Sequence, residues 1–309
     1  MICYFKDHTT FHGDEKELAK SSLAYKKAEL LAPESGISLI TCHRIEYYIP
    51  STIDPSLIRK NVEDFEVVTD SIDVFFRLFS IALGLKSIII GENAVIEQVE
   101  NSVRPYLQHH PLDFKMLNLV KIARKIRDRF DFYSPNHGQL VYRHVSKQKN
   151  DTLILFGAGL LNQTILSSIQ PQSPYKKIIV VTRDKKKARK KLSGIAYPIE
   201  ILKIDDLKAE YLGKSFDVII ATDGMSSQYA KKVVEICRKE ECQTVADLSS
   251  SPIATLEFIS KIYLSLYSKN MEELILNNNF IMEKKRIALE DYLKKLDPKF
   301  WNQKDINLI

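Results

Sequence analysis

The sequence is poor in glycine and cysteine and contains no long apolar run. Ten of its 309 residues are glycine and four are cysteine, whereas average glycine usage is about 7%. The few scattered cysteines exclude a disulfide scaffold, and no run approaches the roughly 20 apolar residues of a membrane-spanning helix. Apolar residues make up 45% of the chain, which excludes a disordered protein. We therefore expect a two-domain protein in a reducing cytoplasm.

The net charge of +6 is concentrated in two basic stretches. Residues 183–191 hold seven Lys or Arg against Asp184, and residues 115–129 hold six against Asp128. A basic stripe can neutralise the phosphates of a nucleic acid, but it can equally be a solvated helix face. The sequence leaves both interpretations open. The six cations of the earlier stretch are Lys115, Lys121, Arg124, Lys125, Arg127 and Arg129.

The second half of the chain alternates short apolar runs with amphipathic stretches. Buried strands separated by helices indicate βαβ units and a parallel sheet covered on both faces. We therefore predict a Rossmann-like, doubly wound domain, followed by one long helix over Met271–Leu296. The runs that predict strands are Thr152–Phe156, Lys177–Thr182, Glu200–Ile204, Phe216–Thr222 and Thr244–Leu248.

The first half is mixed and predicts an α+β domain, so the fold class of the whole chain is α/β. A polar stretch at Gln148–Asp151 marks the boundary, which gives domains at 1–148 and 149–268 and a long helix with its tail at 269–309. Predicted strands are Ile2–Lys6, Ile37–Thr41 and Ile45–Ile49, and predicted helices are Asp14–Leu31, Ser71–Leu83, Asn93–Leu107 and Leu112–Phe132.

A turn with two glycines follows the first strand of the second domain. Gly157 permits a tight turn, and Gly159 lets the backbone approach a pyrophosphate at the start of a helix. Asn162 stands where a third glycine is usual, which predicts a wider contact between helix and strand and weaker binding. A plain tight turn is the alternative. The predicted cofactor-binding residues of this turn are Gly157, Ala158, Gly159, Leu160, Leu161 and Asn162.

The end of the next strand favours NADPH as the cofactor. An NAD site places Asp or Glu there to accept from the ribose hydroxyl groups. This chain has Thr182 and Arg183 instead, which can bind a 2′-phosphate that an acidic residue would repel.

Cys42 lies between two apolar strands. A thiolate forms at neutral pH when positive charge is near, and Arg44 shares a face with Cys42 if the chain is extended. A lone cysteine is more often a small buried apolar residue, which is our interpretation of Cys3, Cys237 and Cys242.

Two motifs resemble those of glutamyl-tRNA reductases. Thr41-Cys-His-Arg-Ile-Glu46 is similar to that family's Thr-Cys-Asn-Arg-Thr-Glu. The second motif, Gly84-Leu-Lys-Ser87 with Gly91-Glu92 and Gln98, resembles Gly-Leu-Asp-Ser, Gly-Glu-Pro-Gln and a later Gln. The basic helix, the glycine turn and Ala246–Ser249 follow in the family's order.

The resemblance implies an activity and a set of site residues. Cys42 would form a thioester with the glutamate of glutamyl-tRNA, and NADPH would reduce it to glutamate-1-semialdehyde, the first step of tetrapyrrole synthesis from glutamate. Glutamyl-tRNA is thus the implied partner, with contacts on residues 115–129, and the downstream glutamate-1-semialdehyde aminomutase is a second. The implied substrate-binding residues are Thr41, His43, Arg44, Ser87, Glu92, Asn93, Ala94 and Gln98.

The sequence departs from the family in three places. The family histidine near the cysteine is Arg77, which cannot exchange protons near pH 7 but can stabilise a thiolate or an oxyanion; we count it as catalytic beside Cys42. His43 and His8 are candidate substitutes for that histidine. The Pro-Gln of the second motif is Asn93-Ala94. Because the chain ends at Ile309, we expect the family's helical dimerisation domain to be missing, which leaves homodimer formation open.

Two other functions stay open from the sequence. One is a non-catalytic or weakly active protein that binds tRNA or a partner on the same scaffold. The other is an unrelated NADP oxidoreductase of small molecules, which accounts for 151–267 but leaves both motifs of the first domain unexplained.

Overall fold

The computed structural model describes residues 1–10, 17–18, 21, 36–41, 43–52, 64–169 and 173–295. The chain divides into two compact units. Unit 1 comprises Met1–Pro135 and Leu276–Ile309, and unit 2 comprises Asn136–Ile275. Within the described ranges, no helix has the length and apolar character needed to cross a membrane.

Unit 1 contains an antiparallel sheet of four strands in the order β2-β3-β1-β4. The central strands pair from Ile2↔Ile49 to Asp7↔Arg44. Side chains alternate between the two faces, so that Cys3 and Phe5 face one core while Tyr4 faces another. The strands are β1 (Ile2–Asp7), β2 (Ile37–Thr41), β3 (Arg44–Ile49) and β4 (Glu66–Val68).

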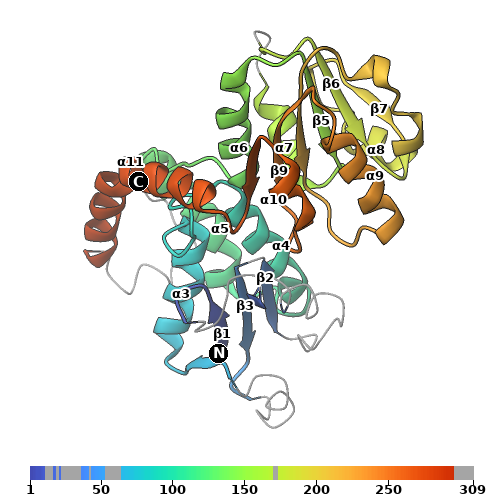
Figure 1. The fold of residues 1–309 in the computed structure, drawn as a ribbon. Helices are drawn as coiled ribbons and strands as arrows, with labels where there is room; N and C mark the ends of the chain where they lie inside the picture. Colours follow the sequence, from blue (N-terminus) through green and yellow to red (C-terminus); the bar gives the residue numbers. More distant parts are fainter. Residues whose placement is uncertain are drawn as a thin grey trace. The chain divides into compact units, whose positions relative to one another are not determined.

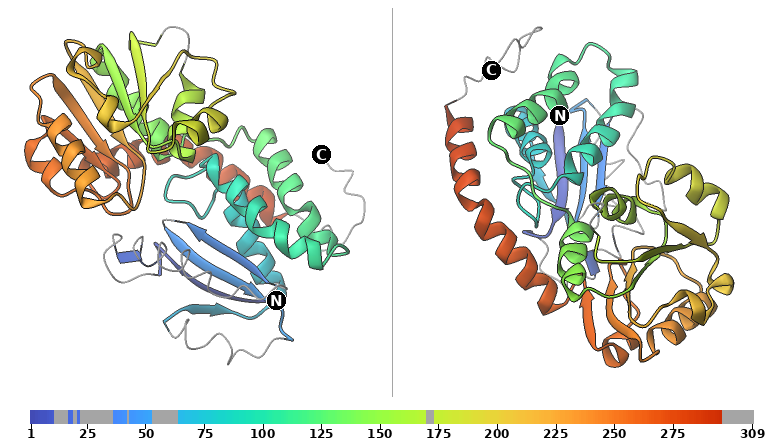
Figure 2. Two further views of the ribbon diagram at one scale, coloured as in Figure 1. Left: turned by 90° about the vertical axis from the view of Figure 1, so that its right-hand side faces the viewer. Right: turned by 90° about the horizontal axis from the view of Figure 1, so that it is seen from above.

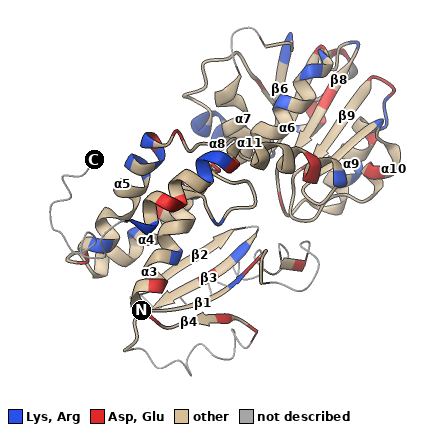
Figure 3. Ribbon diagram, turned by 90° about the vertical axis from the view of Figure 1, so that its left-hand side faces the viewer, with Lys and Arg blue, Asp and Glu red and all other residues tan. Residues whose placement is uncertain are grey.

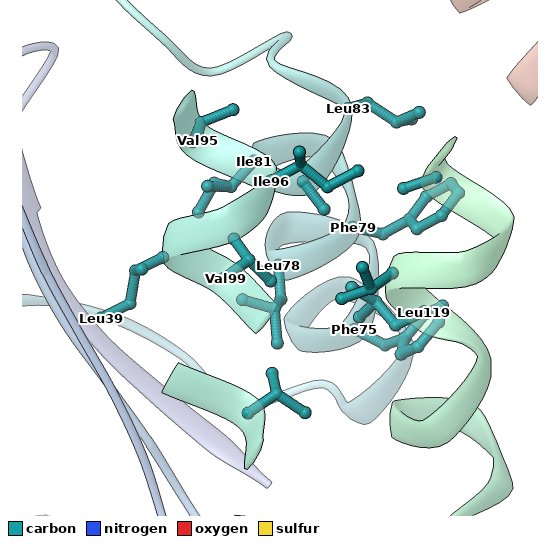
Figure 4. Close-up of a cluster of buried hydrophobic side chains, with 14 of the residues drawn as sticks. Leu39, Phe75, Leu78, Phe79, Ile81, Leu83, Val95, Ile96, Val99 and Leu119 are labelled. Atoms are coloured by element: carbon teal, nitrogen blue, oxygen red, sulfur yellow. The ribbon is translucent and has the colours of Figure 1, made fainter. Parts of the chain in front are cut away.

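Helices α3 (Ser71–Leu83), α4 (Ala94–His109) and α5 (Phe114–Arg129) cover one face of this sheet (Figure 2). The Asp70 carboxylate caps the first turn of α3, and Gly84, at φ 82°, ends that helix in the left-handed region. The core between sheet and helices includes side chains from β2, α3, α4 and α5, among them Leu39, Phe75, Leu78, Val99 and Leu119 (Figure 4). Helix α11 (Lys269–Lys294) adds Met282 and Leu289 to this core.

Unit 2 contains a parallel sheet of six strands in the order β10-β9-β8-β5-β6-β7 (Figure 1). The order reverses between β5 and β8, and ligands of such sheets bind outside the carboxyl ends of the strands at this point. The strands are β5 (Thr152–Phe156), β6 (Lys177–Val181), β7 (Glu200–Leu202), β8 (Phe216–Ile220), β9 (Cys242–Asp247) and β10 (Ile262–Ser265).

One helix of unit 2, α6, precedes β5, and the others lie between successive strands of the sheet (Figure 1). They are α6 (His137–Val145), α7 (Leu160–Ser168), α8 (Lys185–Lys191), α9 (Ser227–Cys237) and α10 (Thr255–Ile259), with short 3₁₀ turns at Ser146–Gln148, Ile204–Asp206 and Ala209–Tyr211. The predicted fold class is therefore confirmed. Strands β4 and β10 and helices α6 and α10 were not predicted, and most of the helix predicted at Asp14–Leu31 lies outside the described residues.

The compact units differ from the predicted domain limits at two places. Helix α6 precedes the predicted boundary but belongs to unit 2, where the Asn136 side chain donates to Thr164 Oγ1 of α7 (2.8 Å). Helix α11 contributes its first residues to unit 2 and its remainder, from Leu276, to unit 1. The assignment of separate functions to the domains stays a prediction.

Candidate functional site

A buried carboxylate, Glu46, organises the helix-covered face of the unit 1 sheet. Side chains alternate along β3, so Arg44, Glu46 and Tyr48 share this face. The carboxylate accepts hydrogen bonds from the Tyr48 hydroxyl (2.6 Å), from Arg44 Nη1 (3.3 Å) and from Arg77 Nε (3.1 Å) and Nη2 (2.8 Å). Because a buried charge is tolerated only when it is paired and hydrogen-bonded, this network fixes both arginines.

Arg77 also joins α3 to the end of β1. Its Nη2 donates to Asp7 Oδ2 (2.7 Å), and its guanidinium carbon lies 3.3 Å from the centroid of the Phe5 ring. Burial raises the pKa of Asp7, but hydrogen bonds from Thr9 and Arg77 outweigh burial and lower it to about 2. The charge of Arg77 is thus matched by two carboxylates, and its action on a thiolate stays a prediction.

Arg44 connects β3 to the segment that follows α3. Its Nη2 donates to the main-chain carbonyl of Lys86, next to Ser87. The Ser87 hydroxyl is buried and has no hydrogen-bond partner among the described residues. Burial raises the pKa of Glu92 to about 7, although the positive charges of Arg44 and Arg127 oppose this shift. Arg44 is thus bonded to the residue before Ser87, and its charge acts on the Glu92 carboxyl.

Contacts from two sides hold the segment from Gly84 to Asn93. Its ends meet where the Gly91 N–H donates to the Gly84 carbonyl (3.0 Å), and a Cβ on Gly84 would lie 2.9 Å from the Gly91 Cα. Arg127 Nη2 donates to the carbonyls of Gly91 (2.7 Å) and Glu92 (3.0 Å) and to Asn93 Oδ1 (3.3 Å). The glycine contact and this arginine together set the position of Glu92.

The glycine turn of unit 2 presents backbone amides at the carboxyl end of β5. Gly157 has a φ of 98°, and a Cβ there would lie 2.9 Å from the Thr222 Cβ. The Asn162 side chain is fully buried and donates to the carbonyls of Phe156 (3.0 Å) and Gly157 (2.9 Å). These carbonyls therefore point toward the helix. The first amides of a helix have no partner within it, so the start of α7 is a place where an anion can bind.

Comparisons with known proteins identify the relatives of this chain. The family model for the N-terminal domain of glutamyl-tRNAGlu reductase matches residues 7–130. The glutamyl-tRNA reductase of Thermosipho melanesiensis is 23% identical over 296 residues, which cover 94% of this chain and 76% of that protein. Protein nfe2 of Rhizobium meliloti is 25% identical over 285 residues, covering 87% and 91% respectively.

Residues 7–130 are thus similar to the N-terminal domain of glutamyl-tRNA reductases, and the similarity to a whole reductase extends over most of this chain. The solved structure of the reductase from Methanopyrus kandleri matches 95% of this chain and 80% of that one, with 17% identity and a TM-score of 0.40.

The structure brings some of the residues expected from the reductase motifs together. Thr41 is buried, and its Oγ1 accepts from the His43 N–H (3.3 Å). The His43 carbonyl accepts from the His8 N–H (3.2 Å). His8 Nδ1 is buried and has no hydrogen-bond partner among the described residues. Cys42, the implied nucleophile of the reductase family, lies outside the described residues.

Three other residues of the reductase motifs lie at the start of α4. The side chain of Asn93 is bonded to Arg127, and Ala94 is buried. Gln98 is partly buried, and nothing in the described residues ties it to Arg44 or Glu92. Substrate binding by these three residues stays a prediction.

The residues predicted to select NADPH lie at the end of β6. Thr182 is partly buried, and its Oγ1 accepts from the Asp184 N–H (3.4 Å). Arg183 is exposed just before α8, whose cations are exposed as well, except for the partly buried Lys185. Leu160 is 44% exposed, and Leu161 is partly buried at the start of α7.

One residue of the basic stretch at 115–129 was assigned to the wrong environment. Arg127 is fully buried and bonded to main-chain carbonyls, so it cannot contact an external phosphate. The remaining cations of α5 are exposed. Figure 3 marks the positions of Lys and Arg along this helix in blue. Arg124 pairs with Glu100 (2.5 Å), and Arg129 stacks on Tyr292. The sequence does contain a pattern that predicts the burial of Arg127. This residue follows Ala123 by four positions and Leu119 by eight, which places it on the apolar side of the helix.

The sequence analysis did not identify the residues that hold the candidate site residues in place. Glu46 belongs to the first motif, and strand alternation alone places it on the face of Arg44. No local sequence pattern predicts the contacts of Asp7 with Arg77 or of Asn279 with Ile90, because the partners are distant in the sequence.

Proposed function

We propose that this chain is an NADPH-dependent reductase of glutamyl-tRNA that releases glutamate-1-semialdehyde. The relationship to the glutamyl-tRNA reductase family supports a reaction of this class. By the motif around Cys42, the thiolate attacks the ester carbonyl, a carbon–sulfur bond forms, and the tRNA leaves through its ribose oxygen.

The observation that carries the proposal is the meeting of Arg44, Ser87 and Glu92. Arg44 uses two of its five N–H groups in the described contacts, which leaves donors for a carboxylate. Glu92 has no hydrogen bond from a described side chain and can accept from an ammonium group. The unpartnered Ser87 hydroxyl can bind either group. A site with donors for a carboxylate and an acceptor for an ammonium suits an amino-acid moiety.

We assign proton transfer near the first motif to His8. Its main chain is bonded to His43, the residue after Cys42 in the chain, and its Nδ1 has no hydrogen-bond partner in the part of the chain that the structure describes. Burial and the charges of Arg44, Lys86 and Arg77 lower the pKa of His8, against the influence of Asp7. A neutral imidazole at pH 7 is a base, which Arg77 cannot be.

The turn of unit 2 fits a dinucleotide. Gly157 has the positive φ and the close approach to Thr222 that a tight turn before a helix needs, and the first amides of α7 have no partner within the helix. We assign the pyrophosphate to Gly157–Asn162 and a 2′-phosphate to Thr182 and Arg183. When bound, NADPH supplies the hydride that reduces the thioester to the aldehyde. The exposed cations of α5 are our candidates for the tRNA contact.

A second candidate function is supported by one comparison. The relative Protein nfe2 shares most of its length with this chain and is not named as a reductase. A protein that binds tRNA or a partner on this scaffold would keep the exposed cations of α5 and have no turnover.

One experiment separates these two functions. We expect glutamyl-tRNA and NADPH incubated with the protein to give an aldehyde that can be trapped, and Cys42→Ser to give none. Matched incubations with Cys237→Ser serve as the control, because Cys237 is buried in the unit 2 core. An intact protein that makes no aldehyde, while Cys42→Ser binds glutamyl-tRNA as tightly as the wild type, would favour the binding protein.

A further inference from the structure

Three consecutive asparagines lie near the middle of helix α11. Asn277, Asn278 and Asn279 interrupt a helix of 26 residues that is otherwise rich in Leu, Ile, Lys and Glu. Asparagine disfavours helix interiors because its amide competes for backbone hydrogen bonds. A reason for these residues must therefore lie in what their side chains contact.

Asn279 makes a two-point contact with the main chain of the second motif. Its Nδ2 donates to the Ile88 carbonyl (2.8 Å), and its Oδ1 accepts from the Ile90 N–H (2.9 Å). This pairing is the one that a neighbouring β-strand would provide, and it needs a donor and an acceptor on one planar group. Asn278 donates to Ser134 Oγ (3.1 Å), whereas Asn277 is exposed.

The clamped residues stand between two residues of the candidate site. Ile88–Ile90 separates Ser87 from Glu92 and carries the chain to Gly91, against which the Met282 methyl packs. Arg127 holds the following carbonyls from helix α5. Residues of helix α11 therefore hold the segment before Glu92 in position, and Arg127 of α5 holds the carbonyls that follow it.

We propose that Asn279 is a positioning residue of the substrate site. By clamping Ile88–Ile90 it holds the Ser87 hydroxyl and the Glu92 carboxyl in the arrangement that binds the substrate. The identity of that substrate rests on the proposed function, whereas the clamp rests on contacts within unit 1 alone.

Asn279→Ala and Asn277→Ala form a matched pair. Both remove an amide from the same stretch and raise helix propensity, but only the first breaks the clamp. We expect Asn279→Ala to raise the KM for glutamyl-tRNA about tenfold, with kcat changed less than about threefold, because the lost bonds act on binding. Hydrogen exchange of the Ile90 amide should accelerate about tenfold or more. Asn277→Ala should match the wild type in both readouts.

The outcomes distinguish this inference from the proposed function. Equal KM values for the two variants in an active protein overturn the inference, as does a loss of kcat that merely follows a fall in melting temperature. Should Asn279→Ala not fold, Asn279→Asp keeps the acceptor for Ile90 but loses the donor to Ile88, and it should raise KM in the same way. A wild type that makes no aldehyde overturns the proposed function; the variants are then compared by their Kd for glutamyl-tRNA, and equal Kd values overturn the inference.

Discussion

Arg77 and Glu46 share two hydrogen bonds, from Nε to Oε2 at 3.1 Å and from Nη2 to Oε1 at 2.8 Å. Their side chains are 10% and 0% exposed, and they join helix α3 to strand β3. The arginine at the position of the family histidine is thus part of the packing between helix and sheet. This role can be tested separately from any role in catalysis.

Arg77→Met should lower the free energy of unfolding by about 3–5 kcal/mol, because it leaves the buried Asp7 carboxylate without its cation and the buried Glu46 carboxylate with Arg44 alone. Urea denaturation at pH 7 measures this loss. Arg104→Met in α4 is the control, since Arg104 is 66% exposed and should contribute less than about 1 kcal/mol. Equal stabilities of the two variants would contradict a structural role for Arg77.

Glu92→Gln should stabilise the protein at pH 8 but not at pH 4. The pKa of Glu92 in the folded protein is about 7, above its ordinary value of 4.5, so the folded state binds the proton more tightly than the unfolded state. The wild type therefore loses stability as pH rises from 4.5 through 7, by about 1–3 kcal/mol. Denaturation of both proteins at several pH values measures the difference. A constant difference across this range would rule out the shifted carboxyl.

Gly157→Ala should raise the Kd for NADPH about tenfold or more. The φ of 98° and the 2.9 Å approach to the Thr222 Cβ leave no place for a methyl group, so the turn must shift. Gly194→Ala is the matched control, because a Cβ there would meet nothing within 4 Å. Fluorescence titration with NADPH measures both. If the two variants bind alike, the turn is not the phosphate site.

Arg183→Ala should weaken NADPH binding about 10-fold to 100-fold and leave NADH binding unchanged. The expected loss is that of a charge-assisted contact with the 2′-phosphate, a group that NADH lacks. Arg189→Ala in α8 serves as the control, since it is an equally exposed arginine six residues further along. Parallel titrations with the two cofactors measure the ratio of affinities. A proportional loss for both cofactors would assign Arg183 to general electrostatics.

The regular elements were the part most open to prediction. Thr152–Phe156 and Ser71–Leu83 have the limits in the structure that the apolar pattern predicted, because a buried strand and an amphipathic helix leave clear periods. Strand β10 was missed because its four residues are too few to show a period. Helix α6 was missed because its apolar residues lie next to a stretch that was read as a boundary.

Only those residues of the candidate site that belong to the two sequence motifs could be predicted. Arg44, Ser87 and Glu92 were expected from two separate motifs; Arg44 is bonded to the residue before Ser87, and the role of all three residues in substrate binding stays a prediction. The partners that hold them were not expected, because pairing depends on contacts between distant segments. Arg127 contacts Gly91 from 36 residues away and Asn279 contacts Ile88 from 191 residues away, and neither distance leaves a local pattern.

The clamp on Ile88 has a consequence for how the protein is made. Unit 1 is assembled from two stretches of chain, and the whole of unit 2 lies between them in the sequence. A ribosome therefore completes unit 2 before Asn279 is synthesised, and domains generally fold as units during synthesis. We expect the nascent protein to pass through a stage in which unit 2 is folded while the substrate segment still awaits helix α11. Helix α11, which emerges after unit 2, thus completes a site whose first residues were made before unit 2.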